Sequence, residues 1–167
     1  DSNWLDRLVD GVQHSRVTLR LPERTGIDLD VKAGDVELDG VPALRGRLMA
    51  GDLDARGLRA VDLAVNAGDV ELELDPAPGL HRVRLSVGDL DVRLPDGADV
   101  RVEGHVSIGD ASASPPFATQ RSGMVAESLE GVMGEGRATL RIDVGTGDLK
   151  VEARRLSLIH ISEPTRL

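Results

Sequence analysis

Aspartate is the residue type in this 167-residue chain whose spacing suggests chemistry. Six Gly-Asp pairs recur along the chain, and the first three are 17 residues apart. The pairs are Gly34 and Asp35, Gly51 and Asp52, Gly68 and Asp69, Gly88 and Asp89, Gly109 and Asp110, and Gly147 and Asp148. Carboxylates repeated in this way could provide oxygen ligands for a cation such as calcium, or two of them could cleave a glycosidic bond.

Cation binding is the first of these chemistries to weigh. A second acidic residue lies two positions beyond each of the first four aspartates, at Glu37, Asp54, Glu71 and Asp91. Stacked repeats would align these side chains in a column of one sign, which solvent, nearby arginines or a cation must screen. The glycine-dense, nine-residue repeat of RTX calcium sites does not occur here. We therefore predict no metal and no cofactor, with this column as the alternative site for a cation.

No residue is singled out by the sequence as catalytic. The chain has 29 acidic residues, so a pair at glycosidase spacing would arise by chance. The glycine-rich stretches lack the Lys-Ser/Thr ending of a phosphate loop, and there is no nucleophile-elbow motif. His14, His81 and His105 have no partner at metal-binding spacing and are predicted to be surface residues. We predict that the protein is not an enzyme; a carbohydrate-active enzyme is the less favoured alternative.

The Gly-Asp pairs have a structural interpretation that accounts for their number. Glycine reaches positive φ without a Cβ clash, and an Asp side chain accepts a hydrogen bond from a nearby backbone amide. Apolar residues alternate on both sides of each pair, but the alternation slips by one residue across it: Val65 and Ala67 end one run, and Val70 begins the next. Each pair is therefore predicted to be a corner, with the residue before Gly and the residue after Asp facing one interior.

Two architectures are compatible with such corners. In a β-solenoid the chain bends and stacks in parallel on the previous coil, whereas in a meander Gly-Asp is a hairpin turn between antiparallel strands. The positions four residues beyond each Asp are Asp39, Arg56, Glu73, Arg93, Ser114 and Glu152, and the first four alternate in sign. Stacked coils would place opposite charges side by side, which favours the solenoid. The predicted fold class is all-β and β-solenoid-like.

The chain divides into segments of different character. Residues 1–16 have apolar residues at helical spacing, including Trp4 and Leu8, which predicts a short amphipathic helix that caps the first coil. Residues 17–155 form the β-repeat domain, within which 114–136 lose the repeat and are either a loop excursion or a degenerate coil. Residues 156–167 resemble a translated sequencing adapter and are predicted not to be native.

Composition restricts the partners. The formal charge of −9 argues against nucleic acid, which needs clustered Lys and Arg. No run of residues approaches the roughly 20 apolar positions that span a bilayer, so membrane association is expected only through a segment upstream of residue 1. Trp4 and Phe117 are the only aromatic residues, which predicts a thin core of aliphatic side chains.

The repeated phrase resembles a known family. Residues 65–72 (VNAGDVEL), 85–95 (LSVGDLDVRLP) and 136–151 (GRATLRIDVGTGDLKV) are similar to the bacterial putative-adhesin repeat domain and to the related toast-rack-like C-terminal domains of LiaF and PspC-type envelope-stress proteins. The resemblance covers about residues 17–153.

The resemblance implies a toast-rack fold and a non-enzymatic domain of the cell envelope, membrane-associated or extracytoplasmic, that binds a protein or an envelope component, including other copies of itself. A role in the envelope-stress response is part of this expectation. The alternative is a bactofilin-like polymerising scaffold in the cytoplasm, because bactofilins also consist of short β-helical coils. A polymer of that kind would need uncapped terminal coils.

Overall fold

The computed structural model describes residues 3–7, 16–20 and 25–154, and these residues form strands and connections with no helix. The strands are β1 (Asn3–Arg7), β2 (Arg16–Arg20), β3 (Thr25–Val31), β4 (Asp35–Asp39), β5 (Ala43–Ala50), β6 (Leu53–Leu58), β7 (Ala60–Ala67), β8 (Val70–Leu74), β9 (Gly79–Val87), β10 (Leu90–Pro95), β11 (Val100–Ile108), β12 (Ala111–Ala113), β13 (Ala118–Ser122), β14 (Ala126–Met133), β15 (Ala138–Thr146) and β16 (Leu149–Arg154). No helix in the described part is long and apolar enough to cross a membrane.

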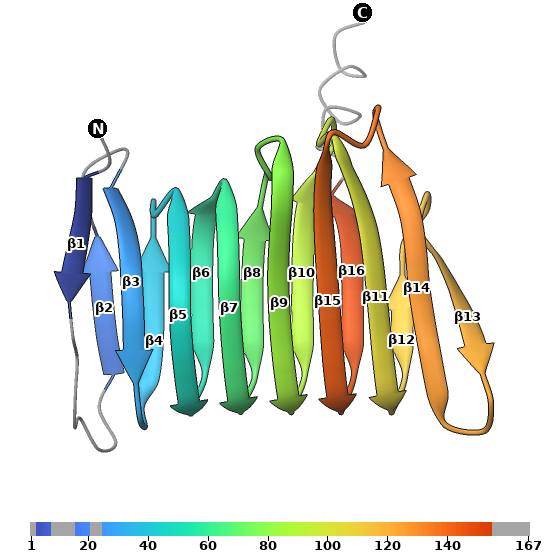
Figure 1. Ribbon diagram of the computed structural model, residues 1–167, viewed down its shortest axis with the longest axis horizontal. Coiled ribbons are helices and arrows are strands. Elements are labelled where there is room, and N and C mark those ends of the chain that lie inside the picture. Colours follow the sequence, from blue (N-terminus) through green and yellow to red (C-terminus); the bar gives the residue numbers. More distant parts are fainter. Residues whose placement is uncertain (1–2, 8–15, 21–24, 155–167) are drawn as a thin grey trace, which may run out of the picture.

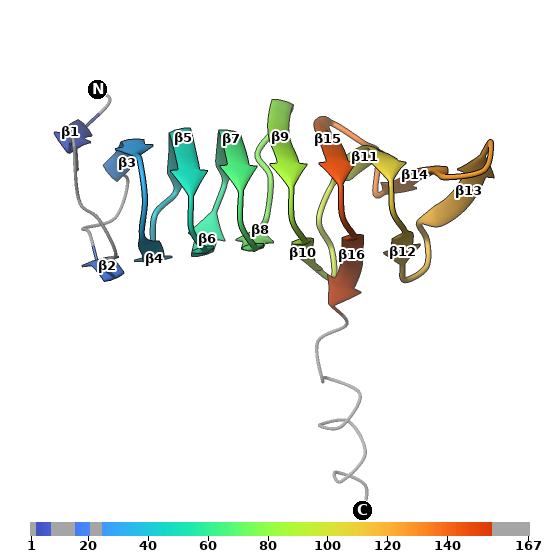
Figure 2. The same cartoon turned by 90° about the horizontal axis from the view of Figure 1, so that it is seen from below.

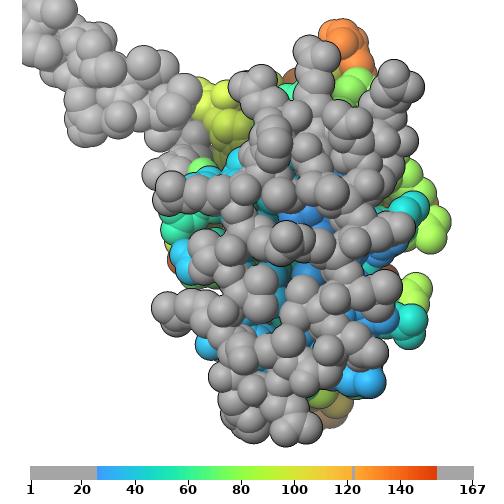
Figure 3. Space-filling view, turned by 90° about the vertical axis from the view of Figure 1, so that its left-hand side faces the viewer, coloured from blue at the N-terminus to red at the C-terminus, as the bar shows by residue number. Residues whose placement is uncertain are grey.

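The strands form two facing sheets, as Figures 1 and 2 show. The nine-stranded sheet has the order β1-β3-β5-β7-β9-β15-β11-β14-β13, and the seven-stranded sheet has the order β12-β16-β10-β8-β6-β4-β2. Each coil contributes one strand to each sheet, and neighbouring coils pair in parallel. This parallel pairing confirms the solenoid and excludes the antiparallel meander. Figure 3 views the molecule from the left-hand side of Figure 1, and blue, green and orange parts of the chain show around the residues drawn in grey.

The order of the coils in space differs from their order in the sequence. The last coil, β15 and β16, lies between the coil of β9 and β10 and the coil of β11 and β12. In Figure 1 the red β15 accordingly lies between the green β9 and the olive β11. After β10 the chain therefore skips one layer, forms the coil of β11 and β12 and then residues 114–136, and returns as β15 and β16 to fill the layer that it skipped.

The core between the sheets is almost entirely aliphatic. Val65 and Val70, on either side of one corner, are 2% and 1% exposed, as the predicted common interior requires. The prediction is wrong for the residue directly before glycine: Val87 and Ile108 are 53% and 54% exposed. At this position the strand has already passed the edge of the core and turns outward into the corner, so the last inward-facing residue lies two positions earlier, as Leu85 does.

The segment 114–136 is neither an open loop nor a degenerate parallel coil. It forms a hairpin of β13 and β14, and β14 pairs antiparallel with β11, which ends the parallel stack. Phe117 is 5% exposed and closes the core at this end, and a Cβ at Gly131 would lie 2.4 Å from its ring. We refer to residues 114–136 as the cap, because they cover the coil of β11 and β12.

The predicted N-terminal helix is wrong for the residues that the structure describes. Asn3–Arg7 form β1, which pairs in parallel with β3. As an edge strand, these residues form a ladder of backbone hydrogen bonds with β3. A short isolated helix would lack comparable tertiary support. Residues 8–15 of the predicted helix, including Leu8, and the suspected adapter, 156–167, lie outside the described residues.

Candidate functional site

The corner glycines form a column in which each touches the backbone of its neighbour. All six have φ between 134° and 143°. A Cβ on Gly68 would lie 1.7 Å from the carbonyl oxygen of Gly51, and one on Gly88 would lie 1.8 Å from that of Gly68. The same relation continues through Gly147 to Gly109. Glycine is required here both by its conformation and by the approach of the next layer.

The corner aspartates form a second column beside the glycines. The Oδ1 atom of Asp52 accepts a hydrogen bond from the N–H of Asp69 at 3.2 Å, and Oδ1 of Asp69 accepts one from the N–H of Asp89 at 3.3 Å. Each of these carboxylates therefore accepts a hydrogen bond from a backbone amide of the next layer. We had expected the amide to belong to the same turn. The ladder runs in spatial order through Asp35, Asp52, Asp69, Asp89, Asp148 and Asp110. We call these six residues the Asp ladder.

The acidic residues proposed as an alternative cation site do stack. Strand register places Glu37 beside Asp54, Asp54 beside Glu71, and Glu71 beside Asp91. The first three of them and the first three residues of the Asp ladder, Asp35, Asp52 and Asp69, line an open groove of about 340 Å³. The next residue of the column is Lys150, which ends the run of one sign.

Arginines on the same strands partly neutralise the negative charge of this column. Arg56 Nη2 lies 3.6 Å from Asp54 Oδ2, and Arg93 Nη2 lies 3.7 Å from Asp91 Oδ2. Asp91 Oδ1 is a buried atom without a hydrogen-bond partner. Within the described ranges, no three His, Cys, Asp or Glu residues are grouped so that they could hold a metal ion. Glu37 and Glu71 are exposed, and Asp54 and Asp91 are half-buried.

The predicted alternation of charge on the seven-stranded sheet is present and extends further than the sequence suggested. Asp39 lies beside Arg56, and Arg93 lies between Glu73 and Glu152, because the last coil is inserted next to β10. Lys150 Nζ and Glu152 Oε1 are 2.7 Å apart. Their hydrogen bond raises the pKa of Lys150 and lowers the pKa of Glu152. Ser114, placed in this series by sequence, instead accepts a hydrogen bond from the N–H of Ala153 at 2.8 Å.

One histidine has a different position from the one predicted. His105 is exposed and His14 lies outside the described residues, but His81 is only 4% exposed. Its Nδ1 accepts the N–H of Val61 at 3.3 Å, and its Nε2 donates to the carbonyl of Ala77 at 2.7 Å. The spacing between corners lengthens from 17 to 20 residues here, so a loop departs from the repeat and His81 binds its backbone. This longer spacing is the sequence signal that could have identified His81 as buried.

The cap completes the ladder at its last layer. In inner layers the N–H after the corner Asp donates to a neighbouring Asp carbonyl, as Leu149 does to Asp110 at 2.9 Å. Within the described residues no further coil covers Ala111, and its N–H donates to Glu127 Oε2 at 2.6 Å. Arg121 in turn holds Glu127 Oε1 at 3.0 Å and lies 3.9 Å from Asp110. The bonds from Ala111 and Arg121 lower the pKa of Glu127.

A second carboxylate fixes the return from the cap to the last coil. Asp99 Oδ1 accepts the N–H groups of Glu135 and Arg137 at 2.8 and 3.1 Å, and Arg137 Nε lies 3.3 Å from Asp99 Oδ2. These contacts, chiefly the backbone bond from Arg137, lower the pKa of Asp99. Asp99 therefore holds the turn that directs β15 into its layer.

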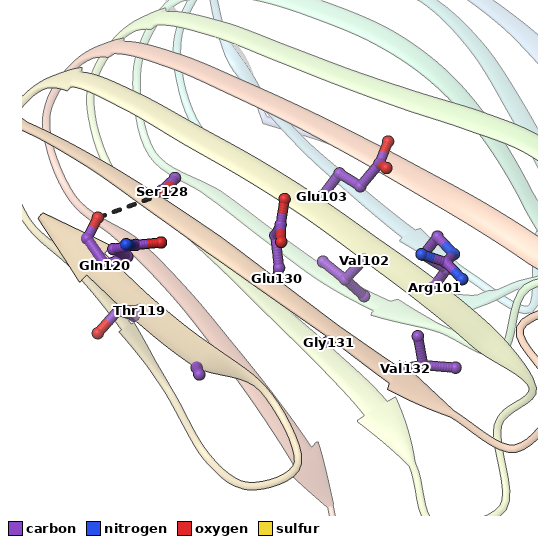
Figure 4. Close-up of a pocket in the computed structure, with 10 residues that line it drawn as sticks. Arg101, Val102, Glu103, Thr119, Gln120, Ser128, Glu130, Gly131 and Val132 are labelled. Carbon is purple, nitrogen blue, oxygen red and sulfur yellow. Dashed lines mark hydrogen bonds between the residues drawn. The ribbon is translucent and has the colours of Figure 1, made fainter. Parts of the chain in front are cut away.

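Beside the cap, the outer face of the nine-stranded sheet is hollowed into a groove of about 460 Å³ (Figure 4). Arg101 and Glu103 line it from β11, Glu130 and Val132 from β14, and Gln120 from β13. Glu103 and Glu130 lie directly opposite each other in the antiparallel pair, and Glu103 is paired with Arg141 at 3.2 Å. The lining is polar and of mixed charge.

A different surface lies along the corner edge, on the other side of the glycine column from the Asp ladder. We call it the corner strip; it consists of the uncharged residues before the corner glycines and their continuation into the cap, Ala50, Ala67, Val87, Thr146, Ile108 and Val125. All are exposed, and Val125 is 56% exposed. Met124, in the β13–β14 turn beside Val125, is 92% exposed. Sequence reasoning missed this strip because it placed the residues before the corner glycines in the core and did not connect Val125 with them.

These features define the class of protein: a two-sheet parallel β-solenoid whose corners are stacked Gly-Asp pairs. Residues 16–152 match the family described as Toastrack DUF4097, and the chain belongs to this family. No curated protein matches the chain. A crystal structure of a putative cell adhesion protein from Clostridium sporogenes ATCC 15579 is similar, with 16% identity and a TM-score of 0.45. The match covers 78% of this chain and only 56% of that chain.

Proposed function

We propose that this domain is a non-enzymatic binding module of the bacterial cell envelope, displayed outside the cytoplasm, that attaches to a protein or another envelope component. The observation that carries the proposal is the corner strip, where Val87, Ile108 and Val125 are each more than half exposed and Thr146 fills the layer between Val87 and Ile108. Apolar side chains gathered on a rigid surface mark sites of interaction. Membership of the Toastrack family supports the same reading.

The repeat itself favours a scaffold over a catalyst. Five of the six ladder carboxylates accept the amide of the next layer, and the sixth, Asp110, faces Arg121 of the cap. The acidic residues that recur most regularly are therefore engaged in holding layers together. The name of the Clostridium sporogenes protein agrees with an adhesive role, but that likeness is too distant to carry the assignment.

The bactofilin-like alternative meets an obstacle at the cap. Growth of a filament by stacking coils would require a free edge that continues the parallel ladder. At the described end, β14 pairs antiparallel with β11, and Glu127 occupies the amide that a further coil would bind. We infer that the domain does not polymerise through this end.

Cosedimentation of the labelled domain with isolated bacterial envelope, separated into cell-wall sacculi and membrane vesicles, tests the proposal. We expect saturable binding to one fraction, sedimentation of the free domain as a small species, and no release of soluble glycan. Absence of binding to either fraction would contradict the binding module. Filaments in the free sample would instead support the scaffold, and released glycan would support an enzyme.

A further inference from the structure

We propose that the corner strip and the Asp ladder together form the docking surface for an extended protein segment in which apolar and basic residues alternate. This deepens the proposed function, on which it rests, by naming the chemistry of the partner. The inference starts from the arrangement of three parallel columns along one edge of the solenoid: uncharged side chains, glycines, and aspartates. At the foot of Figure 1 this edge contains the ends of β7, β9, β15 and β11 and the β13–β14 turn.

The first column provides apolar contact. Register places Ala67 beside Val87, Val87 beside Thr146, and Thr146 beside Ile108, with layers about 4.8 Å apart. Gly109 donates its N–H to the carbonyl of Val125 at 3.3 Å, so the cap extends the column by one more position. The side chains become larger from Ala50 and Ala67 towards the cap. The strongest apolar contact is therefore expected at Val87, Ile108 and Val125.

The second column leaves room for a backbone. On five of the six corner glycines a Cβ would point into the adjacent layer, so no side chain stands between the strip and the ladder, and the glycines are half-buried along the whole edge. A polypeptide lying over them would have apolar side chains on one side and the aspartates on the other. Close approach of a ligand backbone is a common use of glycine.

The third column provides the charge. Five of the six ladder aspartates direct Oδ1 to the amide of the next layer, yet all six are exposed. Within the described part of the chain, Asp110 is the only one of the six with a basic side chain inside 4 Å, from Arg121. A row of carboxylates about 4.8 Å apart repels itself, and Lys or Arg residues of a partner would relieve that repulsion. The glycine column keeps this row close to the corner strip.

Charge also decides against other occupants. The protein carries a net charge of −9, and the Asp ladder lies directly beside the strip. An anionic lipid surface would be repelled, and a second copy would bring another acidic row to the same edge. A basic segment is attracted. Because a strand rises about 3.3 Å per residue and the layers repeat at about 4.8 Å, such a segment is recognised by its overall pattern and not residue by residue.

The probe is a short fluorescent peptide of alternating lysine and valine, titrated with the intact domain and followed by anisotropy at low and high salt. We expect saturable binding that weakens with salt. The double variant Val87→Ser with Ile108→Ser should weaken binding by about tenfold, or 1.4 kcal/mol. The matched control is Leu80→Ser, because Leu80 is 50% exposed on the same strand as Val87 but lies at its opposite end. That control should leave binding unchanged.

The charge contribution has its own pair of variants. Asp69→Asn with Asp89→Asn keeps the Oδ1 acceptors but removes two charges, and it should weaken binding and reduce its salt dependence. Asp62→Asn, an exposed position on the nine-stranded sheet, should do neither. Every substituted side chain is exposed, so we expect all variants to fold. Their melting temperatures check this.

Several results would overturn the docking surface. They are no saturable binding of the lysine–valine peptide, equal binding of a glutamate–valine peptide, or equal losses in the control variants. Binding to phosphatidylglycerol vesicles that Val87→Ser abolishes would assign the strip to lipid, and a dimer that the same change dissociates would assign it to a second copy. If the wild type binds the envelope and the Val87→Ser, Ile108→Ser variant binds it equally well, this inference is wrong and the proposed function stands. If the wild type does not bind the envelope at all, the proposed function is wrong, and the peptide titration still tests the docking surface.

Discussion

The carboxylate of Glu127 accepts a hydrogen bond of 2.6 Å from the backbone N–H of Ala111. In the layer before, the equivalent N–H of Leu149 donates to a backbone carbonyl, that of Asp110. A side chain thus supplies the hydrogen-bond acceptor that the backbone of a further coil would otherwise provide. Because Glu127 is only 9% exposed and held by Arg121, the last layer has a fixed acceptor where water would otherwise have to serve.

Substitution of Glu127 by alanine is expected to lower the melting temperature, because it leaves the Ala111 amide and Arg121 without their common partner. Glu130→Ala is the matched control, since Glu130 lies on the same strand and is exposed. It should change the melting temperature little. Equal effects of the two substitutions, measured by thermal denaturation at neutral pH, would show that the cap does not depend on this carboxylate.

The same carboxylate predicts a dependence of stability on pH. The pKa of Glu127 is lowered below its ordinary value of 4.5, first by the Ala111 amide and then by Arg121. A group whose pKa is lower in the folded state stabilises the fold fully above its unfolded pKa, and this contribution is lost as the pH falls through the folded pKa. The difference in melting temperature between the wild type and Glu127→Gln should therefore shrink below pH 4.5. A difference that stays constant down to strongly acidic pH would contradict the assignment.

The glycine column predicts a large difference between two substitutions that strain the backbone alike. Gly79 and Gly68 have φ of 127° and 143°, but a Cβ on Gly79 meets nothing within 4 Å, whereas one on Gly68 meets a carbonyl oxygen at 1.7 Å. Gly79→Ala should cost about 1–3 kcal/mol by conformational strain. Gly68→Ala should cost clearly more, because backbone atoms of two layers must separate. Urea denaturation measures both, and similar losses would mean that the layers adjust easily.

Removal of the buried imidazole of His81 should destabilise the protein, because the ring bonds two backbone groups. His81→Ala leaves the N–H of Val61 and the carbonyl of Ala77 without their partner, and an unsatisfied buried group costs about 1–3 kcal/mol. The exposed His105→Ala should stay within about 0.5 kcal/mol of the wild type. If chemical denaturation finds the two variants equally stable, water has entered to replace the ring.

The corners could be predicted from the sequence because glycine and the shift in alternation report directly on backbone geometry. Val65 and Val70 were placed correctly in one interior by that argument. The positions of Val87 and Ile108 were not, because alternation gives the side of a strand but not how far the core extends along it. Parallel stacking was favoured only by charge, since both candidate folds share the same periodicity.

The order of the layers and the cap could not be predicted, because they depend on contacts between distant segments. One trace of the inserted coil is present in the sequence: a Cβ on Gly145 would lie 2.5 Å from the carbonyl oxygen of Ser86 in the adjacent layer. A single glycine does not identify its neighbour, however. The bond from Ala111 to Glu127 likewise joins two residues that no motif connects.

The Asp ladder finally predicts opposite effects from two substitutions at one position. Asp69 Oδ1 accepts the N–H of Asp89 at 3.3 Å, while its negative charge faces those of Asp52 and Asp89 in adjacent layers. Asp69→Ala removes the acceptor and should cost about 0.5–1.5 kcal/mol. Asp69→Asn keeps an oxygen acceptor and removes the repulsion, so at low salt it should be at least as stable as the wild type.

Added salt separates the two contributions. Screening relieves like-charge repulsion in the wild type, so its melting temperature should rise towards that of Asp69→Asn as sodium chloride is added, while the deficit of Asp69→Ala persists. Asp62→Asn provides the reference for loss of one exposed acidic charge outside the ladder. If Asp69→Asn is destabilised as much as Asp69→Ala at every salt concentration, the ionised carboxylate itself holds the corner, and repulsion along the ladder is too weak to matter.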